Sequence, residues 1–428
     1  MKFVLLTQYY PPEVGGAQVM LSTFAYELRR HGHDVRVVTA LPNYPTGRIF
    51  DGYRGRLFVK EERDGIPVLR TWTYPSQSAS FIPRLTCYLT FCASSMFALR
   101  WIGKPDIIFV DSPPLFLPVV ADWISRLKGA RWVLNVADLW PDSLVEMGMV
   151  KEGLLLRMAR RLEMHLYRSA DFVGAVTEGI KTTLLRDKGI DDRKIIFLPL
   201  GVDTDVFRPD VPNSALQKQY GLEDKSVFLF AGTLGHPQAL PQIIEAAAIL
   251  RERSDIALVF VGDGPVRAAL ESDCRKRGLT AVHFVDPVPL EQISAWYSIA
   301  RAALVTLQDR PIFDGARPSK TLPPLACGIP VIYAGRGEMA RIINDANAGI
   351  VVPPEQPEAL ADAIRRMADD ADLARQLGRK GRLLCEKDFS WHTIVGNWLE
   401  ALRTKTDDRR LDDVDRGRLI REPNPNVK

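Results

Sequence analysis

Short and nearly continuous apolar runs alternate along the chain with segments whose apolar residues recur at helical spacing. Residues 17–30 show the helical spacing, with Val19, Leu21, Phe24 and Leu28 on one side. Such an alternation of buried strands and amphipathic helices predicts an α/β fold that is built on a doubly wound, mostly parallel sheet. The apolar runs of strand length in the first half of the chain are residues 2–7, 35–39, 107–110, 132–136 and 172–176.

The alternation restarts after a turn-rich and proline-punctuated stretch at residues 198–212, which predicts an interdomain linker. We therefore expect two Rossmann-like domains, residues 1–197 and 198–385, that face each other across a cleft. A helix is expected at 386–403, and the densely charged tail 404–428 is expected to be disordered. Further apolar runs of strand length follow the linker at residues 227–230, 257–261, 282–284, 302–306 and 331–333.

Composition narrows the class of protein. The 428 residues carry a net charge of only +4, which favours no nucleic-acid partner, and 46% of them are hydrophobic, as in ordinary globular proteins. Five scattered cysteines form no CxxC pair, so we expect reduced thiols in a cytoplasmic protein. The opening residues MKFVLLTQYYPP contain too short an apolar run for a signal peptide.

Residues 81–102 form the most apolar helical segment of the chain, but its uncharged stretch, residues 85–99, falls short of the roughly 18 apolar residues of a membrane span. Such a segment is commonly a buried helix. Because Arg84, Arg100 and Lys104 flank it, the segment could equally rest on a membrane surface while these side chains reach the headgroups. The sequence leaves both interpretations open.

Polar residues at strand ends are the first candidates for a site, since ligands of open α/β sheets bind at the carboxyl ends of the strands. Gly15 and Gly16 open a helix, where the backbone can approach a ligand, although a tight turn that needs glycine explains them equally well. Asp138 follows one strand and Glu178 another. Asp142 or Ser143 is better explained as a helix cap.

The stretch from Arg317 to Ile332 combines a basic run, a short helical segment, a glycine and a strand. A helix that begins near Ser319 would present free N–H groups, and Lys320 beside them suits a phosphate. Pro323 and Pro324 do not fit the interior of that helix, because proline there costs about 3 kcal/mol. Either the helix begins later, with Thr321 as its cap, or it kinks.

Several short motifs occur in a specific order, and together they resemble the family 4 glycosyltransferases of GT-B fold, in the branch that builds bacterial surface polysaccharides such as colanic acid, capsule or O-antigen. The resemblance extends from Met1 to about Leu402. It implies retaining transfer of a sugar from a nucleotide diphosphate, with no metal and no other cofactor, and a C-terminal helix that crosses back onto the first domain. The motifs are YYPPEVGGAQ (9–18), ADLWPDS (137–143), AVTEGI (175–180), LGVDTDVFRP (200–209), FAGTLG (230–235), VGDGP (261–265) and RPSK…ACGIPVI (317–332).

The resemblance also assigns roles to single residues. Gly15, Gly16, Ser319 and Lys320 would hold the donor diphosphate, and Asp138, Glu178 and Asp314 would face the sugars. Pro323 stands where many members carry an acidic residue that binds the ribose, and His236 stands where an arginine or lysine is common. The remaining positions expected to contact the donor are Gly232, Gly262, Gly264 and Arg317.

Three functions follow as hypotheses. The first is a glycosyltransferase that uses a nucleotide sugar and a glycan or polyprenyl-diphosphate-linked acceptor at the cytoplasmic face of the membrane. The second is a homologue that has lost turnover and acts as a binding protein of the same pathway, which Pro323 and His236 motivate. The third, a nucleotide-sugar epimerase, is disfavoured because His31 and His33 lie in a turn before a strand, away from the ligand edge.

Overall fold

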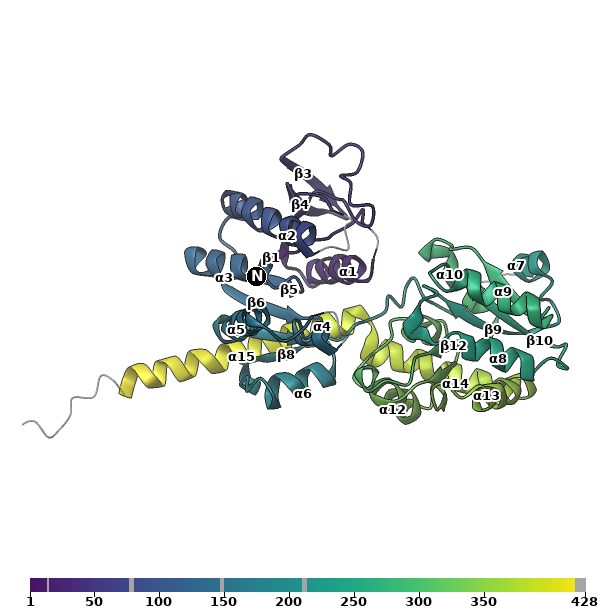
Figure 1. The fold of residues 1–428 in the computed structure, drawn as a ribbon. Coiled ribbons are helices and arrows are strands. Elements are labelled where there is room, and N and C mark those ends of the chain that lie inside the picture. The colour runs from purple at the N-terminus through teal and green to yellow at the C-terminus, as the bar shows by residue number, and fades with distance from the viewer. Residues whose placement is uncertain (14, 77–80, 147–149, 210–213, 420–428) are drawn as a thin grey trace, which may run out of the picture. The chain divides into compact units, whose positions relative to one another are not determined.

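The computed structural model describes all residues except 14, 77–80, 147–149, 210–213 and 420–428. The chain divides into two compact units, one formed by Met1–Pro199 with Ile394–Lys428 and the other by Leu200–Thr393. Each unit contains one sheet with helices on both faces (Figure 1). The predicted fold class, α/β with two doubly wound sheets, is confirmed.

The sheet of the first unit has eight strands in the order β3-β4-β2-β1-β5-β6-β7-β8. All neighbours are parallel except β3 and β4, which pair antiparallel at one edge. The central strands are buried on both sides, which is why they read as continuous apolar runs. The strands are β1 (Lys2–Leu6), β2 (Asp34–Ala40), β3 (Phe58–Arg63), β4 (Ile66–Thr71), β5 (Ile107–Ser112), β6 (Arg131–Val136), β7 (Phe172–Ala175) and β8 (Ile195–Phe197).

Helices cover both faces of this sheet. On one face, Trp398 of α15 (Trp391–Leu419) packs edge-on against Phe24 of α1 (Gly16–Arg30) and Phe109 of β5. On the other face, apolar residues of several helices share a core with alternate residues of β1, β5, β6 and β7. The helices of this second face are α2 (Phe81–Ser95), the 3-10 helix η1 (Met96–Arg100), α3 (Leu117–Lys128), α5 (Leu154–Ser169) and α6 (Glu178–Arg186).

The chain returns to the first unit through α15. The sequence predicts disorder for residues 404–428, and this is wrong for 404–419, which continue α15. A helix already anchored by buried Ile394, Trp398 and Leu402 extends at little cost, because the unfavourable nucleation step is complete. The rest of that prediction, 420–428, lies outside the described residues.

The sheet of the second unit has six parallel strands in the order β11-β10-β9-β12-β13-β14. The apolar runs did not mark β14, nor β8 of the first unit, because β14 opens with glycine and β8 has only three residues. The strands are β9 (Ser226–Ala231), β10 (Ile256–Val261), β11 (Val282–Val285), β12 (Ala300–Thr306), β13 (Val331–Ala334) and β14 (Gly349–Val352).

Two apolar cores fill the two sides of the second sheet, so its four central strands, β9, β10, β12 and β13, are buried on both faces, whereas the edge strands β11 and β14 are only partly buried. One core contains residues of α10, α11 and α12, and the other contains residues of α8, α9 and α13. The short helix α4 (Asp142–Glu146) belongs to the first unit. The helices of the second unit are α7 (Ser214–Tyr220), α8 (Pro241–Ile249), α9 (Arg267–Arg277), α10 (Leu290–Ser298), α11 (Leu322–Ala326), α12 (Gly337–Ala346), α13 (Pro357–Asp369) and α14 (Ala371–Leu384).

Candidate active site

Each sheet has one point at which the strand order reverses. In the first sheet the chain runs outward from β1 and returns on the other side of β1 with β5, and in the second sheet the same happens between β9 and β12. Ligands of doubly wound sheets bind outside the carboxyl ends of the strands at such a switch point. The loops that follow β1, β5, β9 and β12 are therefore where a substrate is expected.

The loop after β1 carries Gly15 and Gly16 and leads into α1, whose first turn offers free backbone N–H groups. This loop is held by Glu13, a buried carboxylate that the sequence analysis did not single out. Its oxygens accept hydrogen bonds from the backbone N–H groups of Asn43 and Tyr44 at 2.8 Å each and from that of Tyr10 at 3.2 Å. The only sequence signal was an acidic residue between the prolines and the glycines.

Arg70 of β4 holds the same loop from the side of the sheet. Its side chain is fully buried, forms an ion pair with Glu61 at 2.7 Å, and donates hydrogen bonds to the carbonyl groups of Ala40 and Pro11. A buried arginine is stable only when its donors are used in this way. The glycine loop is thus fixed to the fold by two charged residues, Glu13 within the loop and Arg70 on a strand distant in sequence.

Asp111 lies at the carboxyl end of β5, the other strand of the first switch point, and only 9% of it is exposed. One of its oxygens accepts a hydrogen bond from the Asn135 amide at 2.8 Å. Burial raises the pKa of Asp111 to about 6, since it disfavours the charged form and Asn135 offsets only part of that. Asp111 directly follows the apolar run at residues 107–110, but Asp138 was the strand-end carboxylate that the sequence singled out.

The two carboxylates favoured by the sequence lie at the carboxyl edge of the same sheet, after β6 and β7. Asp138 is exposed and accepts a hydrogen bond from Ser143 at 3.0 Å. Glu178 is the first residue of α6, and Thr177 caps that helix by accepting from the N–H of Ile180. Both carboxylates are therefore accessible at the predicted edge, and their roles stay predictions.

In the second unit, Lys320 lies directly over Gly232, the residue that follows β9. A Cβ atom at Gly232 would come within 2.5 Å of the Lys320 Cε, and Gly232 has a φ of +127°, a conformation that favours glycine. The ammonium nitrogen lies 5.8 Å from the centre of the Phe230 ring. Burial lowers the pKa of Lys320, and no carboxylate of the described residues pairs with it. A half-buried cation without a counter-ion suits an anionic ligand.

The glycines after β9 and β10 allow two loops to meet backbone to backbone. A Cβ at Gly262 would lie 2.1 Å from the Gly232 carbonyl oxygen, and one at Gly264 would lie 2.4 Å from the Leu234 carbonyl oxygen. This close packing supports the loop on which Lys320 rests. A contact of these glycines with the donor itself remains a prediction.

The expected helix near Ser319 begins later than the diphosphate hypothesis required. Helix α11 starts at Leu322, with Thr321 at its N-cap position although the threonine hydroxyl makes no capping bond. Pro323 and Pro324 thus occupy the first turn, where a missing N–H costs nothing. Because α11 has only five residues and starts after Lys320, the lysine itself is the stronger phosphate candidate.

Arg317, expected to contact the donor, is engaged inside the fold. Its guanidinium bonds the Glu338 carboxylate, with its Nε at 2.6 Å, and lies over the Phe389 ring. Glu338 is buried, and the Arg317 side chain is only 10% exposed. Asp314 is exposed, and its backbone carbonyl accepts a hydrogen bond from the N–H of Glu338 at 2.7 Å, so Glu338 in the first turn of α12 positions both Arg317 and Asp314.

His236 begins a 3-10 turn (His236–Gln238) after the glycine loop and lines a hollow of about 360 Å³ within the second unit. Its other walls come from the starts of α8 and α13 and from the loops after β12 and β14. The histidine is thus solvent-accessible at the carboxyl edge of the sheet. The lining includes Ala239, Gln242, Glu245, Gln308 and Glu355.

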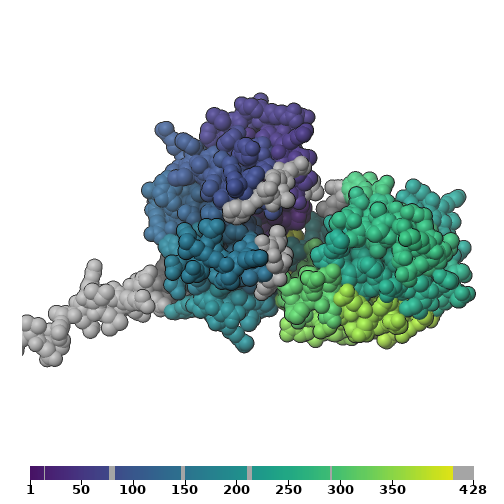
Figure 2. Space-filling view, viewed as in Figure 1, coloured from purple at the N-terminus to yellow at the C-terminus, as the bar shows by residue number. Residues whose placement is uncertain are grey.

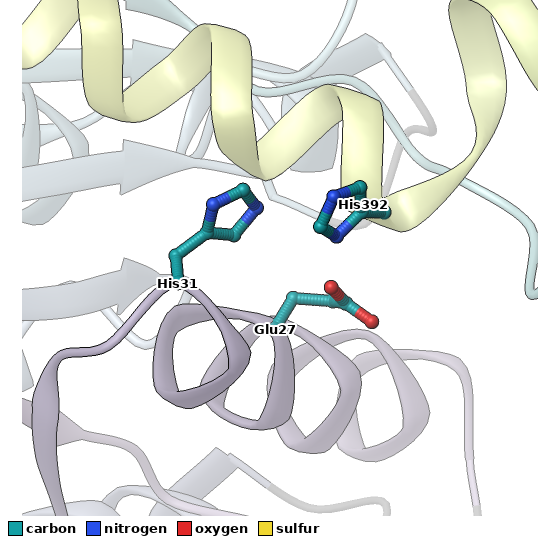
Figure 3. A group of neighbouring side chains, drawn as sticks. All are labelled: Glu27, His31 and His392. Atoms are coloured by element: carbon teal, nitrogen blue, oxygen red, sulfur yellow. The ribbon is translucent and has the colours of Figure 1, made fainter.

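One group of side chains has the composition of a metal site. Glu27, His31 and His392 place one ligand atom each within 4.8 Å of one another (Figure 3). Glu27 and His31 lie at the C-terminal end of α1, whereas the glycine loop precedes its N-terminal end. This group therefore has no place in the candidate site.

Two family models match the chain and together cover most of it. A glycosyl transferase 4-like domain matches residues 15–201, and glycosyl transferases group 1 matches residues 213–384. With two doubly wound units and a ligand edge at each switch point, the chain belongs to the family 4 glycosyltransferases of GT-B fold. The resemblance stated from the motifs is confirmed.

Several named glycosyltransferases are similar in sequence to this chain over most of their own length. The colanic acid biosynthesis glycosyl transferase WcaI of Escherichia coli K12 is 29% identical over 86% of this chain and 92% of its own. The glycosyltransferase WbjE of Pseudomonas aeruginosa is 27% identical over 70% and 75%. A GDP-mannose-dependent phosphatidylinositol monomannoside mannosyltransferase of Mycolicibacterium smegmatis is 27% identical over 95% and 100%. The protein is accordingly a glycosyltransferase.

Solved structures agree with the fold. HepE of Anabaena, in complex with UDP, superposes with a TM-score of 0.71 over 94% of this chain and all of its own at 17% identity. Sucrose-phosphate synthase of Thermosynechococcus elongatus gives 0.69 over 97% and 100% at 20% identity. At such identities the likeness shows the fold alone.

Proposed function

We propose that this protein transfers a sugar from a nucleoside-diphosphate donor, with retention of the anomeric configuration, to a lipid-linked glycan during the synthesis of a bacterial surface polysaccharide. The single observation that carries the donor assignment is Lys320, a half-buried cation with no carboxylate partner among the described residues, at the switch point of the second sheet. The name of WcaI, a colanic acid biosynthesis glycosyl transferase, supports the pathway, and the UDP complex of HepE supports the donor class.

The reaction that this site would serve breaks the bond between the anomeric carbon and the diphosphate oxygen and forms a bond from that carbon to the acceptor oxygen. The proton of the acceptor hydroxyl passes to the departing diphosphate. The charge to be stabilised therefore develops on the phosphate oxygens, where Lys320 and the backbone of the Gly15–Gly16 loop would lie. No residue would need to form a covalent intermediate for this route.

The remaining site residues have roles that their positions support. Asp138 and Glu178 are exposed carboxylates that can accept hydrogen bonds from sugar hydroxyls. Asp314, held by the backbone bond to Glu338, can do the same from the second unit.

We further propose that the protein works at the cytoplasmic face of the membrane, where a polyprenyl-diphosphate acceptor resides. One helix of the described part, Ile82–Arg100, is long and apolar enough to cross a membrane, and 28% of that stretch is buried. Its exposed Arg84 and Arg100 support a helix that rests on the bilayer surface. The relative that acts on a phosphatidylinositol mannoside has a lipid acceptor in its name.

The direct test is a screen of the purified full-length protein against a panel of UDP- and GDP-sugars with membrane lipid extract as acceptor, read by mass spectrometry. The expected product is an acceptor lipid heavier by one sugar residue, with release of the nucleoside diphosphate. A Lys320→Met variant should lose the product while staying folded. Absence of any product and of any nucleotide binding by the wild-type protein would overturn the proposal.

The second candidate, a homologue without turnover, has one specific observation in its favour. Pro323 occupies the first turn of α11, where its side chain offers no hydrogen bond to a ribose. Calorimetric titration with nucleotide sugars separates the candidates, because a protein that has lost the donor site would release no heat. Recovery of binding in Pro323→Glu would assign that loss to this position.

A further inference from the structure

We propose that the outer surface of three helices in the first unit, α2 with η1, α3 and α5, is a single docking surface for an anionic lipid bilayer. This surface is larger than the 81–102 segment that the sequence singles out. This inference depends on the proposed function at one point, because a lipid-linked acceptor requires that the enzyme work at the membrane. The surface, here called the three-helix face, is defined by its exposed apolar side chains Ile82, Leu89, Met96, Phe97, Val119, Trp123, Leu127, Leu154, Leu155 and Met158.

The three helices form one continuous layer. Helix α3 contacts both α2 and α5, and all three send apolar residues into the same core on one side of the sheet. Phe91 of α2, Ile124 of α3 and Leu166 of α5 point into that core. The apolar residues left outside are therefore surplus to folding, since each helix has already buried its inner face. Figure 2 shows part of the surface of this unit in blue.

The exposed apolar residues follow the outward side of each helix. On α3, Val119, Trp123 and Leu127 recur at intervals of four residues, which places them on one stripe. On α5, Leu154 and Leu155 in the first turn are 64% and 75% exposed, and Phe97 of η1 is 74% exposed. In the second unit, the large apolar side chains found exposed among the described residues are only Val206, Ile249, Ile312 and Leu383.

The charges on these helices favour an anionic partner. Arg84, Arg100, Arg126, Arg157 and Arg161 are all exposed. The acidic residues on α2, α3 and α5 are Asp122, which pairs with Arg126, and Glu163, which is buried with Lys188. Apolar side chains bordered by arginines match a bilayer interface with anionic headgroups, in which acyl chains take up the apolar groups and phosphates bind the cations.

Vesicle sedimentation of the full-length protein tests this surface. With phosphatidylcholine vesicles that contain phosphatidylglycerol, the wild type should bind, and binding should weaken at high salt because the cationic contribution is screened. Leu155→Gln with Phe97→Gln should lower the partition coefficient at least about ten-fold, since two large apolar side chains are withdrawn from the interface. Trp123→Gln with Leu127→Gln should weaken binding comparably, because α3 lies in the same face.

The matched control is Leu383→Gln on α14 of the second unit, a leucine that is 64% exposed, as Leu154 is. It should leave vesicle binding unchanged. Thermal unfolding checks that every variant is folded, which is expected because all the substituted side chains lie at the surface. If the α3 pair behaves like the control while the Leu155 and Phe97 pair does not, the three-helix face is refuted in favour of a smaller contact.

Two further outcomes separate this inference from the proposed function. Variants that lose vesicle binding but retain turnover on a short-chain, water-soluble acceptor analogue support the surface and leave the chemistry intact. Vesicle binding by a protein that transfers no sugar supports the surface and overturns the function. Light scattering tests whether a second copy of the chain occupies this face instead. If the wild type does not bind vesicles but forms a dimer that the same substitutions dissociate, the bilayer proposal is refuted and the face is assigned to a second copy of the chain.

Discussion

Replacing Lys320 with methionine should weaken nucleotide binding more than any other single change in the second unit. The side chain lies over Gly232, half-buried, with its ammonium nitrogen near the Phe230 ring and without a carboxylate partner among the described residues. Methionine keeps most of the volume and removes the charge. A hydrogen bond to a charged group contributes about 1.5–3 kcal/mol, so the Kd for UDP or GDP should rise roughly ten- to a hundred-fold.

Gly232→Ala tests the geometry of the same contact without touching the charge. A Cβ at this position would lie 2.5 Å from the Lys320 Cε, so the lysine must move, and a φ of +127° strains any alanine. Because the binding defect would act through Lys320, the double variant should bind no more weakly than Lys320→Met alone.

Isothermal titration with UDP and with GDP measures these affinities, and thermal unfolding reports stability separately. Lys276→Met, an exposed lysine on α9, is the control and should bind as the wild type does. Wild-type affinity in Lys320→Met would refute the assignment of Lys320 to the diphosphate. Additive losses in the double variant would show that Gly232 and Lys320 act independently.

Three other predictions concern the loops of the site. Burial raises the pKa of Asp111 from 3.8 to about 6, so its charged form destabilises the fold, and that cost is absent below pH 4 and complete above pH 6. Asp111→Asn should therefore raise the free energy of unfolding by roughly 3 kcal/mol at pH 8 and hardly at all at pH 4. Urea titrations at the two pH values measure this, and equal gains in stability at both would contradict burial as the cause. Glu13→Ala leaves three backbone N–H groups without their acceptor; it should lower stability by at least about 2 kcal/mol and weaken donor binding, and unchanged thermal unfolding would argue against a clamp. Pro323→Glu should fold normally, because an acidic residue suits the first turn of α11, and should tighten nucleotide binding in calorimetry; loss of binding would show that the proline itself shapes the pocket.

Local patterns were sufficient for much of the fold. Apolar runs such as residues 132–136 became strands because a parallel sheet buries both faces of its central strands. Strands without such a run, such as Gly349–Val352, were missed, since only their pairing with a neighbour makes them strands. The tail 404–419 was misjudged for a similar reason: its helix is an extension of one that packs elsewhere.

The sequence by itself determined the glycine-bearing loops and the two doubly wound units, because turn residues and periodicity act over a few neighbours in the chain. Only the tertiary structure decided how the charges at the site are used, including the position of Lys320 over Gly232. Arg317 pairs with Glu338, and the Asp111 carboxylate meets the Asn135 amide, through contacts between residues more than twenty positions apart. Whether a charge faces a ligand or a buried partner depends on which distant side chain the fold brings beside it. The partner of each charge is therefore set by tertiary packing, and no local sequence pattern predicts it.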